Sequence, residues 1–410
     1  MRDTVTLTTK PRFQALPPLS LYVHIPWCVR KCPYCDFNSH EARSTVPERE
    51  YVEALVADLE RALPSIWGRP VYSVFFGGGT PSLFSGESID AILAAVRARV
   101  PLAADAEVTL EANPGTVEAA KFRAFRAVGV NRLSLGIQSF SPRHLKAIGR
   151  IHDDAEARHA IEIARGHFDN VNLDIMYALP EQTPEEARAD IAAAIGYAPQ
   201  HISAYHLTIE PNTYFYRFPP QLPDDDTAAA MQEEIEAALA AAGYEHYETS
   251  AFAKPGMRSR HNLNYWLFGD YLGIGAGAHS KLSLPGRVLR QMRYKQPRRY
   301  MEMTAQGKPV QEEHEVAPHE ISFEFMMNAL RLTEGFPLAL FEERAGLPLT
   351  TALRGLEEAE RRGLVARDLT RVAPTALGRR YLNDLLQIFL PAEGGHGQEE
   401  AAHAGFATLR

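Results

Sequence analysis

The chain has 410 residues, a formal net charge of −8 and 45% hydrophobic residues, a length that predicts one large domain with a smaller one. The negative charge argues against nucleic acid or an anionic membrane surface as the main partner. No stretch approaches the ~18 apolar residues of a membrane span, and the N-terminus lacks the apolar run of a signal peptide, so we expect a cytoplasmic protein.

Strands and helices alternate along the first half of the chain. The strands are nearly continuous apolar runs, which is typical of a parallel sheet covered on both faces. This alternation predicts parallel βαβ units. Six strand–helix units are present, whereas a complete barrel has eight, so any barrel would be partial. The predicted strands are 21–26, 71–76, 107–113, 131–140, 170–180 and 201–209, and the predicted helices are 48–62, 88–100, 116–127, 155–164 and 184–195, the last opening with Thr183 as N-cap and Pro184 in first position.

Both a doubly wound sheet and a barrel fit this alternation. The cysteines, the glycine-rich turn, Glu111, Gln138 and Asp174 all lie at or just past the C-terminal ends of strands. Active sites of barrels are built at that end. We therefore expect a partial (β/α)6 barrel of the TIM type over residues 19–245, preceded by an N-terminal extension, residues 1–18.

The second half of the chain has a looser pattern. Residues 246–317 are predicted to be a connecting region. Residues 318–390 carry short amphipathic helices, a two-stranded ribbon and a last helix, which predicts a winged-helix-like α+β domain. Basic residues in that domain are interspersed with acids, so we expect no nucleic-acid role. The composition of residues 391–410 predicts a disordered tail.

The three cysteines of the chain lie within Cys28-Val-Arg-Lys-Cys32-Pro-Tyr-Cys35. An odd number packed this tightly is no disulfide framework and indicates a shared metal centre. Electron-transfer iron–sulfur clusters use four thiolates, so three would leave one iron with an open site. A zinc site completed by His24 or His40 is the alternative, although a second paired cysteine knuckle is absent from the sequence.

The Cys-x3-Cys-x2-Cys spacing, with Tyr34 before the third cysteine, resembles the radical S-adenosylmethionine superfamily. The longer string LYVHIPWCVRKCPYCDFNSH is similar to the family that contains oxygen-independent coproporphyrinogen III oxidase (HemN) and its relative HemW. The resemblance implies a [4Fe–4S] cluster on Cys28, Cys32 and Cys35. Its open iron would chelate S-adenosylmethionine, which an electron from the cluster cleaves to methionine and a 5′-deoxyadenosyl radical.

Further positions match the elements with which this family holds S-adenosylmethionine. The turn Gly77-Gly78-Gly79-Thr80-Pro81 would be only a turn by itself, and the resemblance assigns it to the methionine amino group. Asp174 is informative because an unpaired carboxylate in a buried strand is costly. Ala178 stands where relatives commonly have glycine. The full set that the resemblance implies is Tyr22, Tyr34, Phe37, Gly77, Gly78, Gly79, Thr80, Glu111, Gln138, Arg150 and Asp174.

Two features distinguish the members of this family. HemN-type oxidases carry a further cysteine two residues past the third, where this chain has Phe37. Residues 261–266 contain the string His-Asn-x-x-Tyr-Trp, which resembles a HemW signature and implies haem binding by His261, Asn262, Tyr265 and Trp266. Judged from the residues alone, the same string could be a hydrogen-bonded corner that docks the linker on the barrel. His279, in GIGAGAHS, is a second candidate ligand.

The resemblance thus implies a haem chaperone that binds haem and a cluster coordinated by S-adenosylmethionine and delivers haem to apo-haemoproteins. A reducing electron donor and a homodimer are further implied partners. The alternative within the family is the radical enzyme that decarboxylates coproporphyrinogen III in porphyrin biosynthesis. A third class is a zinc-binding structural protein.

Overall fold

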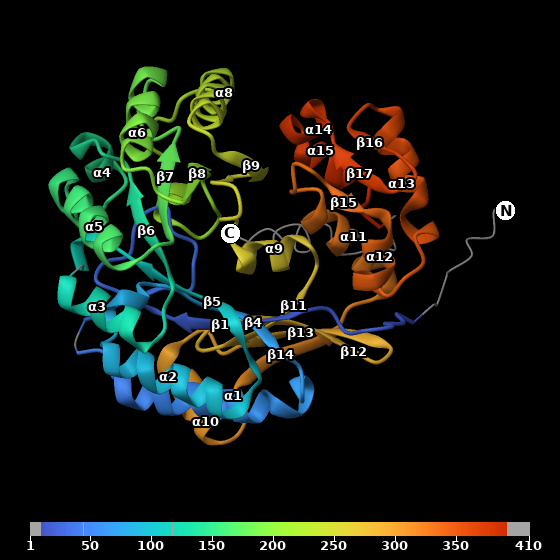
Figure 1. Ribbon diagram of the computed structural model, residues 1–410, viewed down its shortest axis with the longest axis horizontal. Coiled ribbons are helices and arrows are strands. Elements are labelled where there is room, and N and C mark those ends of the chain that lie inside the picture. Colours follow the sequence, from blue (N-terminus) through green and yellow to red (C-terminus); the bar gives the residue numbers. More distant parts are fainter. Residues whose placement is uncertain (1–9, 44, 117, 392–410) are drawn as a thin grey trace.

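The computed structural model describes residues 10–43, 45–116 and 118–391. Most of the predicted tail and half of the predicted N-terminal extension, residues 392–410 and 1–9, lie outside the described residues. Seven parallel strands form the centre of the molecule (Figure 1), in the spatial order β11-β1-β4-β5-β6-β7-β8. Their bounds are β1 (Leu19–Ile25), β4 (Val71–Gly78), β5 (Leu102–Ala112), β6 (Arg132–Gln138), β7 (Val171–Tyr177), β8 (His201–His206) and β11 (Asp270–Ile274).

Helices follow these strands and cover the outer face of the curved sheet. They are α1 (Glu48–Ile66), α2 (Gly86–Arg99), α3 (Ala119–Val128), α4 (Pro142–Ala147), α5 (Asp154–His167), α6 (Pro184–Gly196) and α8 (Asp225–Ala241), with a short α7 (Tyr214–Arg217) after β8. The side chain of Thr183 accepts a hydrogen bond from the N–H of Glu186, and the Glu186 side chain bonds back to the cap residue. This reciprocal capping, with Pro184 in the first turn, confirms the predicted start of α6.

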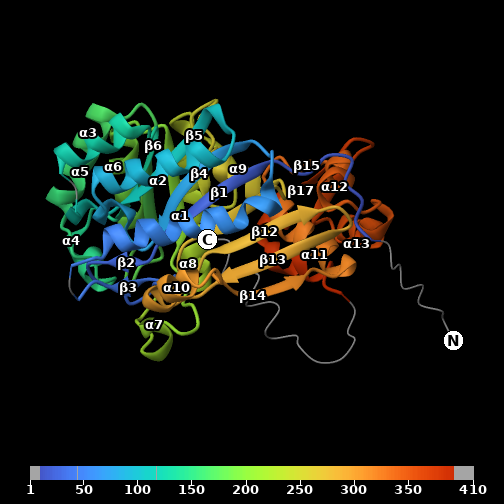
Figure 2. The same cartoon turned by 90° about the horizontal axis from the view of Figure 1, so that it is seen from below.

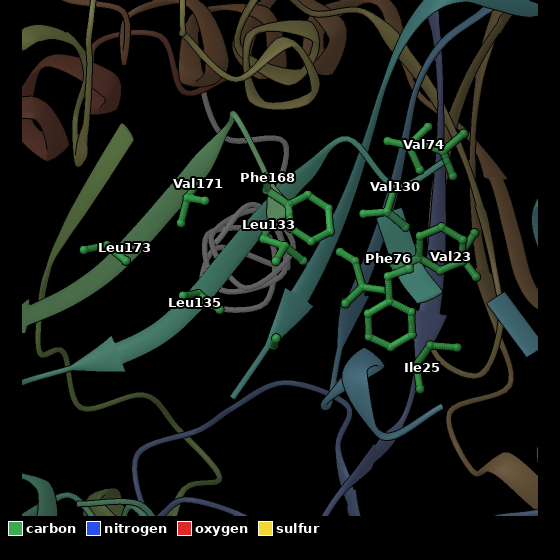
Figure 3. Packing of buried hydrophobic residues seen from close by; sticks show 14 of the residues in the cluster. Val23, Ile25, Val74, Phe76, Val130, Leu133, Leu135, Phe168, Val171 and Leu173 are labelled. Atoms are coloured by element: carbon green, nitrogen blue, oxygen red, sulfur yellow. The ribbon is translucent and has the colours of Figure 1, made fainter. Parts of the chain in front are cut away.

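Alternate residues of each strand form the core beneath these helices. Figure 3 shows Val23 and Ile25 of β1 beside Val74 and Phe76 of β4, and the same face continues through later strands. Val23 is in register with Phe76, and both side chains are fully buried. Because side chains alternate across a strand, the residues between them face the inside of the barrel. The core packing therefore determines which side chains reach the interior.

Residues 246–317, predicted to be a connecting region, extend this sheet at both edges. β10 (Ala251–Ala253) and β9 (Glu245–Glu248) add to β8, while β12 (His279–Leu284), β13 (Arg287–Arg293) and β14 (Val310–Glu315) add to β11. The described sheet thus has twelve strands, including a seventh parallel one that the alternation of the first half did not predict. The same region contributes α9 (Arg260–Trp266), against the strands, and α10 (Pro297–Ala305), against α1.

The C-terminal module has its own core and lies beside α9 in Figure 1. Its helices are α11 (Pro318–Ala329), α12 (Leu338–Ala345), α13 (Thr350–Arg361), α14 (Ala376–Arg380) and α15 (Leu382–Gln387), and its strands are β15 (Phe336–Pro337), β16 (Val365–Arg367) and β17 (Arg371–Pro374). The sheet order is β15-β17-β16, so the predicted two-stranded ribbon gains a two-residue third strand. In the described part of the chain, no helix is long and apolar enough to span a membrane.

Candidate functional site

The cysteine loop begins at the C-terminal end of β1. It starts from β2 (Trp27–Cys28) and ends at β3 (His40–Glu41), which pairs with β2 in parallel. The Nζ of Lys31 donates to the carbonyl oxygens of Phe37 at 3.0 Å and Ser39 at 3.3 Å, so the loop is closed on itself. The amide of Asn38 ties it to the connections that follow β11 and β13, donating at 2.8 Å to the carbonyls of Ala276 and Lys295.

Each of the three thiols has a different polar partner. The hydroxyl of Thr80 lies 3.5 Å from the Sγ of Cys28, the Nη1 of Arg150 lies 3.7 Å from that of Cys32, and the hydroxyl of Ser39 lies 3.7 Å from that of Cys35. Burial raises the pKa of Cys28, and it raises that of Cys35 to about 11. Without a metal these two groups are therefore thiols near neutral pH, and binding iron as thiolates would release protons.

The three cysteine thiols are the candidate metal ligands of the loop. A mononuclear zinc site needs its ligands to converge on a single point, whereas a cubane cluster places each thiolate on a different iron. Among residues 10–43, 45–116 and 118–391, no group of three His, Cys, Asp or Glu side chains is arranged to hold a single metal ion. Three thiols are the donor set of an iron–sulfur cluster with one iron not ligated by cysteine.

The glycine-rich turn lies directly beneath this loop. A Cβ on Gly79 would come within 2.5 Å of the Trp27 carbonyl oxygen, and a Cβ on Gly78 within 2.4 Å of the His24 ring. Gly78 also has a φ of +108°, a conformation that glycine adopts without strain. Thr80 continues the contact, since its N–H donates to the Trp27 carbonyl at 2.7 Å. The glycines are therefore needed for close packing of turn and loop, whatever ligand they also contact.

Arg150 connects the loop to two strands of the barrel. Its Nη2 donates to the Oδ1 of Asn113 at 2.5 Å and to the Gly136 carbonyl at 2.8 Å, while its Nη1 faces Cys32. The amide of Asn113 in turn donates to Thr80 at 2.8 Å. The guanidinium is thus fixed in one orientation beside the cluster loop, as an anchor for a carboxylate requires.

Two carboxylic acids face each other inside the barrel. Burial and the neighbouring Asp174 raise the pKa of Glu111 to about 8. Burial also raises the pKa of Asp174, although its oxygens accept hydrogen bonds from Ser134 at 2.9 Å and Asn172 at 2.8 Å. These contacts give the carboxylate of Asp174 the partners that the sequence required. A neutral Glu111 could both donate and accept hydrogen bonds to hydroxyl or amino groups.

The predicted residues share one geometric property. Tyr22, Glu111, Gln138 and Asp174 are partly exposed positions in stretches of strand whose neighbouring residues are buried. Gln138 adopts a φ of +69°, and Ala178, after β7, a φ of +55°. Left-handed residues other than glycine are strained, and such strain is concentrated at functional sites. Glu111 interacts electrostatically with Tyr22 and Asp174 and hydrogen-bonds the Gly78 backbone, so these three side chains lie near the glycine turn.

Tyr34 and Phe37 face in different directions. Tyr34 packs with the apolar side chains of Ile148, Leu207 and Phe215, next to Arg150. Phe37 is 38% exposed, at the position where the oxidases carry a further cysteine. The structure therefore places Tyr34 against the barrel and leaves Phe37 on the surface of the loop.

The His-Asn-x-x-Tyr-Trp string forms α9, which closes the end of the barrel opposite the cluster loop. His261 is only 3% exposed. Its ring stacks on Phe75 with a centroid distance of 4.6 Å, and its Nδ1 lies 3.2 Å from the hydroxyl of Ser73. The carboxylate of Glu107 accepts hydrogen bonds from the N–H of His261 at 3.0 Å and of Arg260 at 3.1 Å. The histidine predicted to bind haem is thus held inside the protein.

The remaining residues of the string also have packing roles. Tyr265 packs edge-on against Tyr271 at 4.5 Å, and the buried Trp266 lies beneath the guanidinium of Arg331 from the C-terminal module, 4.6 Å from its ring centroid. Asn262 is only partly exposed. The string thus builds the corner that joins barrel, linker and C-terminal module, and haem binding by these four residues stays a prediction.

Other residues around the cluster loop have contacts that the sequence did not predict. His24 bonds through Nε2 to the Asn38 carbonyl at 2.9 Å and through Nδ1 to the Tyr22 hydroxyl at 3.1 Å, and burial lowers its pKa to about 4. His279 starts β12, and burial lowers its pKa to about 4 as well. The position of His24 and Asn38 within the cysteine-containing string indicates that they lie near the cysteines. It does not indicate which groups they hydrogen-bond.

Family models match two parts of the chain. The model described as the radical SAM superfamily matches residues 22–194, and the HemN C-terminal domain matches residues 316–381. The fold resembles the solved structure of coproporphyrinogen III oxidase (HemN) from Escherichia coli, with a TM-score of 0.77, 24% identity, and coverage of 91% of this chain and 90% of that one. At that identity the likeness shows the fold, a partial radical SAM barrel with a small C-terminal domain.

Two curated relatives named heme chaperone HemW match nearly the whole chain. The heme chaperone HemW of Escherichia coli is 49% identical over 92% of this chain and 99% of the relative, and that of Haemophilus influenzae is 47% identical over the same shares. The mouse protein named radical S-adenosyl methionine domain-containing protein 1, mitochondrial, is 42% identical over 64% of this chain and 60% of its own length.

Proposed function

Because the chain belongs to the HemW family of radical S-adenosylmethionine proteins, we propose that it is a haem chaperone, which binds haem and delivers it to apo-haemoproteins. The observation that carries the proposal is the 49% identity to a haem chaperone over 99% of that relative's length. Phe37 supports it, because the position of the oxidases' further cysteine is occupied by a side chain that cannot ligate iron. The same proposal places the protein in the cytoplasm, as a homodimer that receives electrons from a reducing donor.

The cofactors of the proposal are a [4Fe–4S] cluster and S-adenosylmethionine. Cys28, Cys32 and Cys35 would hold the cluster, which supplies one-electron chemistry when it is bound. Arg150 offers a fixed guanidinium for the methionine carboxylate, and Glu111 and Asp174 offer hydrogen-bond partners for polar groups of the nucleoside or the amino acid. The glycine turn would offer backbone groups to the same ligand, because glycine has no side chain to cover them.

The proposal is tested with protein purified without oxygen and with a reconstituted cluster. We expect a haem Soret band on titration, transfer of haem to an apo-haemoprotein, and no protoporphyrinogen from coproporphyrinogen III. Formation of protoporphyrinogen would contradict the chaperone proposal and support the oxidase. Metal analysis of the Cys28→Ala, Cys32→Ala and Cys35→Ala variants distinguishes an iron–sulfur cluster from a zinc site. Zinc in place of iron in the unmodified protein would refute the cluster.

A further inference from the structure

A short aromatic segment lies next to the cluster loop, on α7 and the residue that follows it. Tyr214, Tyr216 and Phe218 are 62%, 60% and 53% exposed, whereas Phe215 between them is 5% exposed. The buried Phe215 side chain therefore anchors a five-residue segment that exposes three large aromatic rings to solvent. Exposed apolar groups gathered in this way are typical of binding surfaces.

The segment is attached to the cluster loop itself. The N–H of Phe215 donates to the carbonyl of Pro33, which lies between Cys32 and Cys35, at 3.0 Å. The Phe215 side chain packs in a small apolar cluster that includes Tyr34 of the same loop. Figure 2 shows α7 beside β2 and β3, the two strands from which the loop extends. Thr213 caps the helix, accepting from the N–H of Tyr216 at 3.1 Å. The exposed rings are thus fixed relative to the cluster loop.

Arg217 gives this aromatic surface a positive charge. Its guanidinium carbon lies 5.5 Å from the Phe218 ring centroid, and the rings of Tyr214 and Phe218 are 4.9 Å apart at 42°. The Arg217 residue is itself exposed to solvent. An aromatic pair with an adjacent exposed guanidinium suits a flat apolar ligand that carries carboxylates.

Haem has this chemistry, since its macrocycle is flat and apolar and its propionates are anions. We propose that haem is held on the α7 surface, with the macrocycle against Tyr214, Tyr216 and Phe218 and a propionate paired with Arg217. The inference rests on the proposed function and adds the place of the cargo. It puts haem at the cluster end of the barrel, whereas His261 is buried at the opposite end. The Phe215–Pro33 hydrogen bond then connects cargo surface and cluster loop.

The test is titration of the full chain with haem, monitored by the Soret band and repeated with variants of the α7 surface. We expect Tyr214→Ala/Phe218→Ala to weaken haem binding at least tenfold and Arg217→Gln to weaken it several-fold, with unchanged melting temperature. Haem dimethyl ester should bind the unmodified protein and Arg217→Gln equally, because its propionates carry no charge. The matched control is Trp67→Ala/Tyr72→Ala, which removes two exposed aromatic rings outside this surface and should leave affinity unchanged.

The outcomes separate this inference from the proposal on which it rests. If the unmodified protein binds no haem, the proposed function fails and the inference with it. If it binds haem and the α7 variants bind equally well, haem chaperoning stands and the α7 site is refuted. Variants that keep haem affinity but lose transfer to an apo-haemoprotein would make α7 a surface for the acceptor protein, which also overturns the assignment to haem.

Discussion

Replacing His261 with alanine separates two roles for the histidine of the His-Asn-x-x-Tyr-Trp string. The imidazole is 3% exposed, lies 3.2 Å from the Ser73 hydroxyl and stacks on Phe75 at 4.6 Å. If the ring is a packing element of the barrel end, its loss destabilises the fold. If it is a haem ligand, its loss should abolish haem binding instead.

The structure sets the magnitude of the expected destabilisation. A hydrogen bond contributes ~1 kcal/mol and an aromatic contact ~0.5–1.5 kcal/mol, and the cavity left by the ring adds to both. We therefore expect His261→Ala to lower the free energy of unfolding by about 2–4 kcal/mol. Since each 1.4 kcal/mol corresponds to tenfold, the folded-to-unfolded ratio should fall by roughly 30-fold or more.

The acid dependence of this difference provides a second measurement. Burial lowers the pKa of His261 from 6.5 to about 3, so the folded protein disfavours the proton that the unfolded chain accepts. The corresponding stability is present above pH 6.5 and is lost as pH falls towards 3. The unmodified protein should therefore lose stability over this interval more steeply than His261→Ala.

The assay is urea unfolding across this pH range, together with haem titration under folded conditions. His159→Ala, which removes an exposed histidine on α5, is the matched control and should change neither quantity. A His261→Ala variant with unaltered stability and no haem binding would refute the packing role and identify the histidine as a haem ligand. Unaltered haem binding with lowered stability is the expected result.

Three further predictions address the interior and the cluster loop. Burial and Asp174 raise the pKa of Glu111 from 4.5 to about 8, so the folded protein should lose stability as pH rises through this interval. Glu111→Gln should remove this loss, and an unchanged pH profile of urea unfolding would contradict the prediction. Ala178→Gly should stabilise the fold by up to ~1 kcal/mol in the same assay, because a φ of +55° strains alanine, and destabilisation would show that methyl packing outweighs the strain. Cys32→Ala should lose the brown iron–sulfur absorbance while keeping the circular dichroism of the unmodified protein, and retention of a full cluster would exclude Cys32 as a ligand.

Local sequence determined the parts of this protein whose partners are near in the chain. The spacing of Cys28, Cys32 and Cys35 placed three thiols on one loop, and strand–helix alternation with Thr183 and Pro184 determined the parallel units and the start of α6. Asp174 also stood out, because a carboxylate inside an apolar strand requires polar partners wherever they come from.

Tertiary structure decided the features whose contacts are distant in sequence. Ser73, the hydrogen-bond partner of His261, lies 188 residues earlier, so the histidine's burial could not be read from its own helix. β11 pairs with β1 across some 250 residues of chain. On α7, Tyr214, Tyr216 and Arg217 face solvent. They do so because Phe215 packs into an apolar cluster formed by other strands and the loop of Tyr34. A local pattern specifies which groups are present, whereas the packing of distant elements decides which of them meet solvent.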